Sequence, residues 1–149
     1  MAEINRKELI LALIQAGPNP RLAGVDFSAL DMTRLNLEGS NLRGANFQGA
    51  TTRETILRNT NMTGVDATGA QMPFADFNNS TLLGTNFTGA NLTGVRLAGA
   101  NMTNAVLNGA NLTNADMKGA NVNGVKFDER TTWPDGKKGS ASNPGNYIK

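Results

Sequence analysis

The sequence has 149 residues, of which 39% are hydrophobic and only 5% aromatic, and its formal net charge is +2. It contains neither cysteine nor histidine, which excludes disulfides, thiolate chemistry, the usual zinc ligands and histidine-dependent catalytic triads. The nearly balanced charge favours neither a basic nucleic-acid groove nor a strongly acidic surface.

The first expected element is a helix within residues 1–17. Asn5 followed three residues later by Glu8 matches a capping box, and Gly17 before Pro18 is a typical helix end. One helical face carries Leu9, Ile10, Leu13 and Ile14. A helix of about three turns without a basic face is a poor membrane-surface element. Binding of a partner remains open, but the sequence favours a cap on the domain that follows.

A five-residue period runs through residues 18–130. Every fifth residue from Leu22 to Phe127 is Leu, Phe, Met or Val, with Thr52 and Ala67 as the exceptions. The residue two places before is mostly small, the residue one place before is mostly Asn or Asp, and the residue two places after is mostly Gly. Neither a helix, with its period of 3.6, nor a strand, with its period of 2, explains this spacing. A repeat of this kind predicts a solenoid.

The segments "ANFQG" at 45–49, "ANLTG" at 90–94 and "ADMKG" at 115–119 show the pattern in full. The pattern A-(D/N)-L-x-x resembles the pentapeptide-repeat family. The resemblance implies an all-β solenoid, a right-handed quadrilateral β-helix of about five coils with four pentads in each. It also implies binding of macromolecules rather than catalysis, and a bacterial source rich in such repeats, such as a cyanobacterium.

The same pattern predicts the core. If pentads twenty residues apart lie over one another, at about 4.8 Å per coil, four of the six phenylalanines fall in one internal column. We expect the following residues to face the interior: Phe27, Phe47, Phe87, Leu107, Phe127, Leu92, Leu97 and Met102.

The period is lost in residues 131–149. Trp133 and Pro134 are expected to fold over the last coil and cover its edge. The residues after Asp135 are polar and contain several glycines and lysines, so this part is expected to be a flexible tail.

One corner of the four-sided coil differs from the other three in carrying most of the charges. We expect Ile56 and Phe74 to be neighbours there on adjacent coils, as an exposed apolar spot surrounded by charges, which is typical of a modest protein contact surface. Free variation of outward positions is the alternative explanation. The candidate partner-binding residues are Arg34, Arg53, Glu54, Ile56, Arg58, Phe74, Asp76 and Arg96.

No catalytic residue, metal site or cofactor is indicated, and the Asn-x-Ser/Thr sequons follow from the repeat itself. We therefore expect a cytoplasmic, non-enzymatic scaffold that binds an unknown protein, as a monomer or a weak end-to-end dimer. A small-molecule substrate and a membrane are not expected, and nucleic acid is disfavoured because the chain is poor in aromatic residues. The alternative is a DNA mimic that protects gyrase, which the neutral body of the chain disfavours.

Overall fold

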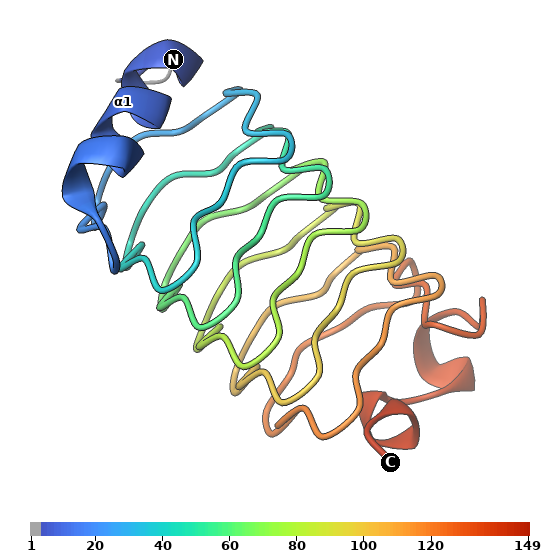
Figure 1. Cartoon of the computed structure of the whole chain (residues 1–149). Helices are drawn as coiled ribbons and strands as arrows, with labels where there is room; N and C mark the ends of the chain where they lie inside the picture. The colour runs from blue at the N-terminus through green and yellow to red at the C-terminus, as the bar shows by residue number, and fades with distance from the viewer. Residues whose placement is uncertain (1–3) are drawn as a thin grey trace.

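The computed structural model describes residues 4–149, so the first three residues of the expected 1–17 cap lie outside the described part. The chain winds into a rod of stacked coils. The α-helix α1 (Arg6–Ala16) covers one end of the rod, and the C-terminal segment folds over the other end (Figure 1).

Helix α1 begins at the predicted capping box. The Asn5 side chain accepts a hydrogen bond from Glu8 N at 2.9 Å, and the Glu8 carboxylate accepts one from Asn5 N at 2.9 Å. The helix ends at Gly17, whose φ of 65° favours glycine. Leu9 is fully buried against the first coil, whereas Ile14, on the same predicted face, is 73% exposed. The apolar face of α1 is therefore only partly covered.

The coils are joined by parallel β-bridges between residues that lie one coil apart. These bridges run without a break from Arg21↔Asn41 to Val106↔Lys126, always at an interval of twenty residues. Within residues 4–149, β-pairing consists of isolated bridges, without longer strands. The expected all-β solenoid is thus built from very short sides, because each pentad uses two of its five residues in a turn.

Four turns close each coil. In a typical turn, Ala45 N donates to Leu42 O at 3.0 Å, and Gly44 has a φ of 64°. A positive φ at the third residue is the mark of a type II turn and explains the recurrent glycine. Asn61 precedes the equivalent turn one coil later; its Oδ1 accepts from Thr63 N at 3.1 Å and from Thr63 Oγ1 at 2.7 Å. The repeated Asn-x-Thr sequence therefore supports the turns.

The predicted core residues lie inside the coils. Phe127 is partly buried and the other seven are at most 1% exposed. The rings of Phe27 and Phe47 contact each other with centroids 5.1 Å apart. One coil further on, the column holds Ala67 instead of an aromatic residue. Phe77, from half a coil away, packs edge-on against Phe87 with centroids 6.1 Å apart. The aromatic column is therefore interrupted at Ala67, and Phe87 contacts a ring from another side of the coil.

The solenoid continues past the expected boundary at residue 130. Asn111 bridges Thr132, an interval of twenty-one residues instead of twenty, so one residue is inserted after Phe127. Trp133 is fully buried and its ring packs on Phe127 with centroids 5.0 Å apart. Trp133 therefore occupies the next central position, which the strict five-residue count missed by one.

The segment expected to be flexible is folded. It contains two short 3₁₀-helices, η1 (Gly139–Ala141) and η2 (Pro144–Tyr147). Trp133 Nε1 donates to Gly139 O at 2.8 Å, and the Tyr147 ring stacks on the Trp133 ring at 5.9 Å. Gly119 N donates to Ile148 O at 2.7 Å, whereas the equivalent Gly99 N donates to Lys118 O of the next coil. Ile148 therefore takes the place of a further coil. The polar composition of this segment reflects specific hydrogen bonds and not disorder.

Candidate functional site

The eight candidate partner-binding residues lie together along one side of the rod, and we refer to them as the charged strip. Bridges Ile56↔Asp76 and Asp76↔Arg96 place three of its members side by side on successive coils. The strip is therefore continuous over coils that are far apart in sequence. Its members are Arg34, Arg53, Glu54, Ile56, Arg58, Phe74, Asp76 and Arg96.

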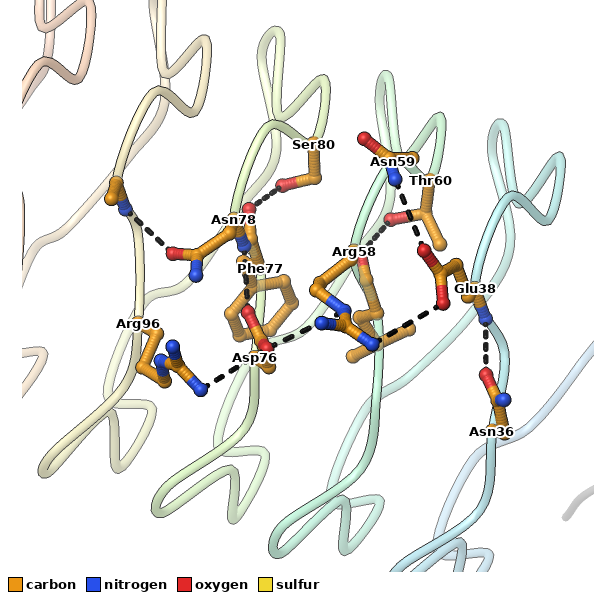
Figure 2. A network of polar contacts seen from close by, with 12 residues as sticks. Asn36, Glu38, Arg58, Asn59, Thr60, Asp76, Phe77, Asn78, Ser80 and Arg96 are labelled. Carbon is orange, nitrogen blue, oxygen red and sulfur yellow. Dashed lines mark hydrogen bonds and ion pairs between the residues drawn. The ribbon is translucent and has the colours of Figure 1, made fainter.

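Ion pairs link the strip along the rod axis (Figure 2). Arg58 Nε and Arg96 Nη1 lie 3.6 and 3.5 Å from the same oxygen, Asp76 Oδ2. Arg58 Nη2 also lies 3.4 Å from Glu38 Oε2, one coil earlier. The other oxygen, Asp76 Oδ1, accepts from Asn78 N at 3.0 Å. The Asp76 side chain is only 12% exposed, so it is a fixed carboxylate between two arginines.

A second cluster is centred on Glu54. Arg34 Nε donates to Glu54 Oε2 at 2.8 Å, and Arg53 Nε donates to Glu54 Oε1 at 3.1 Å. The pKa of Glu54 is lowered below its ordinary value, mainly by the hydrogen bond from Arg34 and next by the one from Arg53. The hydrogen bond between Arg34 and Glu54 also raises the pKa of Arg34. Both arginines pair with Glu54 through Nε, and their side chains are 71% and 56% exposed.

The backbone of the strip is strained at three successive turns. Arg34, Glu54 and Phe74 have φ values of 61°, 55° and 60° at the turn position that favours glycine. A left-handed conformation costs a residue with a side chain about 1–2 kcal/mol. The other three turns of each coil have Gly, Asn or, once, Ala29 at this position. Bulky charged or aromatic residues in this conformation are thus confined to the strip among residues 4–149.

Phe74 is the most exposed apolar residue of the strip, at 53%. Its ring lies over Gly94 of the next coil, where an added Cβ would lie 2.5 Å from two ring carbons. Ile56 is half-buried instead of exposed. The expected apolar spot is therefore centred on Phe74 and Gly94 and not on a pair of exposed side chains.

Sequence reasoning missed the amides that complete the site. Asn59 Nδ2 donates to Glu38 Oε1 at 3.2 Å, and Asn78 Oδ1 accepts from Ala98 N at 2.9 Å (Figure 2). Both partners lie about one coil away in sequence. The twenty-residue register relates Asn59 and Asn78 to their partners, but uncharged amides do not stand out in the charge pattern of the sequence.

A groove of about 620 Å³ lies between α1 and the first coils. Its lining includes Ile10, Leu13 and Leu35, and also Glu38, whose carboxylate is paired with Arg58. Residues 4–149 contain no cluster of three or more acidic side chains able to hold a metal ion. No helix in the described range has the length and apolarity needed to cross a bilayer.

Four-turn coils stacked at twenty-residue intervals, with one external strip of paired charges, define a solenoid repeat protein. The model of pentapeptide repeats matches the chain in 8 copies, over residues 21–51, 53–84, 74–109 and 90–128. The chain belongs to the pentapeptide-repeat family.

Several solved structures are similar to the chain. HetL, a pentapeptide repeat protein involved in heterocyst differentiation regulation in Nostoc sp. strain PCC 7120, is 24% identical; the match covers 79% of this chain and 61% of HetL, with a TM-score of 0.35. Rfr23 from Cyanothece 51142 is 32% identical over 70% of this chain and 64% of its own, with a TM-score of 0.37.

A third similar structure is QnrB1, a plasmid-mediated fluoroquinolone resistance protein. It is 22% identical over 68% of this chain and 55% of its own, with a TM-score of 0.37. The chain thus spans less than two thirds of the length of each of these three proteins. No curated protein matches the sequence.

Proposed function

We propose that this protein is a non-enzymatic scaffold, a right-handed quadrilateral β-helix that binds another protein through the charged strip. The observation that carries the proposal is the backbone strain at Arg34, Glu54 and Phe74. Strained residues persist where the rest of the structure holds them in place, and they cluster at functional sites.

Free variation of an outward surface is the competing explanation for the strip. Such variation would retain glycine or asparagine, which fit the left-handed turn position at little cost. Three successive coils instead carry Arg34, Glu54 and Phe74 there. The exposed ring of Phe74 among paired charges has the composition of a contact surface, in which aromatic residues and arginine are enriched.

The strip is also held in shape before any partner binds. Its backbone is tied to the coils on both sides, as in Phe74 N→Thr93 O at 2.9 Å and Glu54 N→Pro73 O at 3.0 Å. Its arginines are anchored on Glu54 and Asp76. Fewer side chains then need to be ordered on association, which improves affinity.

The test is capture of partners from the native lysate with the immobilised protein. Phe74→Ser should lose the captured proteins, and the control Leu83→Ser, at a 38% exposed residue outside the strip, should retain them. Circular dichroism of both variants confirms that the fold is intact. An identical set of captured proteins for Phe74→Ser and the unsubstituted protein would contradict the proposal.

The alternative, protection of gyrase by DNA mimicry, requires a dense array of negative charge, because B-DNA carries one charge per ~1.7 Å. The charged strip instead contains four arginines against two acidic residues, Glu54 and Asp76. A supercoiling assay with gyrase and a quinolone distinguishes the two functions, and we expect no protection.

A further inference from the structure

We propose that the partner presents an acidic polypeptide segment with an apolar side chain between its carboxylates. The carboxylates bind Arg34, Arg53 and Arg96, and the apolar side chain packs on Phe74. This inference rests on the proposed function and adds the chemistry of the partner.

The first cationic group of the strip is the pair Arg34 and Arg53. Their side chains are 71% and 56% exposed, whereas Glu54 beneath them is 35% exposed. Both pair with Glu54 through Nε, so the Nη edges are available to an outside ligand. A guanidinium group offers donors in a planar fork that matches a carboxylate. Glu54 therefore positions two carboxylate-binding groups side by side.

Arg96 provides the second cationic group. Its side chain is 61% exposed, and its only ion pair within residues 4–149 joins Nη1 to Asp76 at 3.5 Å. Arg58 is less available, because it contacts both Asp76 and Glu38. At Arg96, as at Glu54, the carboxylate lies beneath and the guanidinium faces solvent.

Phe74 lies between these two groups. It follows Glu54 by one coil in the same turn position, and its ring lies over Gly94, two residues before Arg96. Arg34 and Arg96 belong to coils three intervals apart, which is about 14 Å at ~4.8 Å per coil. An extended segment of about four residues spans that length at ~3.3 Å per residue. The partner should therefore carry two acidic residues about four positions apart with an apolar residue between them.

The same geometry disfavours nucleic acid. Glu38, Glu54 and Asp76 alternate with the arginines along the rod and would repel a continuous row of phosphates. Single-stranded nucleic acids also need several aromatic rings for stacking, and Phe74 is the only aromatic residue of the strip.

A library of displayed 12-residue peptides, selected on the immobilised full-length protein, tests the inference. Enriched peptides should contain the spaced acidic pair with an aliphatic or aromatic residue between its members. Their affinity should fall at least tenfold for the double variant Arg34→Ala/Arg53→Ala and for Phe74→Ser. The matched control Arg43→Ala, at an exposed arginine on another side of the coil, should bind as the unsubstituted protein does.

The possible outcomes separate the two proposals. Enriched peptides that depend on Phe74 but show no excess of acidic residues would overturn the acidic partner and leave the proposed function standing. Enriched peptides that depend on neither Phe74 nor the arginines would overturn both. Fluorescence anisotropy with a 20-base-pair DNA duplex at physiological salt supplies the last comparison. Binding that is lost in Arg34→Ala/Arg53→Ala would assign the arginines to phosphate recognition and overturn the inference.

Discussion

The guanidinium group of Arg6 donates from Nη1 to the carbonyl oxygen of Asp31 at 2.8 Å, and its Nη2 donates to Thr33 O at 2.8 Å. In the next coil the equivalent carbonyl, Thr51 O, accepts from Met32 N at 2.7 Å. Arg6 thus supplies the two donors that a preceding coil would provide. One side chain of α1 ends the hydrogen-bond ladder on this side of the rod.

Substitution of Arg6 should destabilise this end. Arg6→Lys keeps the charge but replaces the planar fork with a single ammonium group, which cannot reproduce both bonds in the same geometry. We expect the free energy of unfolding to fall by about 1–2 kcal/mol, measured as a lower urea midpoint. Lys7→Ala, at an exposed neighbouring residue, is the control and should leave the midpoint unchanged. Equal midpoints for Arg6→Lys and the unsubstituted protein would refute this role.

Thr52 is a polar residue at a central position, and its replacement should stabilise the protein. Its side chain is fully buried, and its Oγ1 has no hydrogen-bond partner among the described residues. Thr52→Val removes the unpaired hydroxyl at the same volume, so the free energy of unfolding should rise by about 1–2 kcal/mol. Thr55→Val is the matched control, because Thr55 Oγ1 donates to Met32 O at 2.7 Å. This control should be destabilised, and the two melting temperatures should therefore shift in opposite directions.

The interrupted aromatic column makes a prediction about packing. Ala67→Phe restores the column but inserts a ring close to the space that Phe77 and Phe87 share, and overpacking of this kind costs about 1–3 kcal/mol. Phe77→Leu makes room for the new ring. The double variant Ala67→Phe/Phe77→Leu should therefore be more stable than the sum of the single changes predicts, by about 1 kcal/mol in a double-mutant cycle. Strict additivity would show that the two positions do not compete for space.

The strain at Arg34 can be measured directly. Arg34→Gly and Arg34→Ala both remove the ion pair with Glu54, but only glycine adopts a φ of 61° without strain. We expect the glycine variant to be more stable than the alanine variant by about 1 kcal/mol. Arg43 is the first of the two turn residues of another pentad, directly before Gly44, and this first position does not require a positive φ. There glycine should be no better than alanine, and the same difference at both positions would argue against strain.

The C-terminal segment should open in acid. Hydrogen bonds from Lys137 and then Tyr147 lower the pKa of Asp135 to about 2 from an ordinary 3.8. A carboxyl group with a lowered pKa in the folded state stabilises that state above the unfolded pKa and ceases to do so as the pH falls. The stabilisation by Asp135 should therefore be lost between about pH 4 and pH 2.

Trp133 is the only tryptophan and stacks on Tyr147, so its fluorescence reports on this segment. Asp135→Asn should remove the part of the fluorescence change that falls between about pH 4 and pH 2. A change of the same size in both proteins would mean that other carboxylates control the opening.

The coil could be predicted from the sequence because the residue pattern of each pentad indicates one short side and one turn. A large apolar residue such as Leu92, a small one such as Ala90 and a glycine such as Gly94 recur at fixed intervals along the repeat. The position of the charged strip followed from the same register. The identity of the ring contacts did not, because Phe77 packs against a residue half a coil away and not in its own column.

The two ends were harder to predict because nothing there repeats. One inserted residue after Phe127 moves Trp133 out of the five-residue count, although it still fills a central position. Arg6 has no sequence signal, since its partners are main-chain oxygens. The tail contains too few apolar residues to predict packing, and its fold depends on single contacts such as Tyr147 Oη to Asp135 at 2.8 Å.

The two ends are closed independently of how many coils lie between them. Arg6 donates to main-chain oxygens of the first coil, and Ile148 pairs with Gly119 near the last. Removal of residues 81–100, a whole number of pentads, would join Ser80 to Asn101 in register and shorten the rod by ~4.8 Å. The length of the rod can therefore change in fixed steps of twenty residues, while the structures that cover its two ends stay the same.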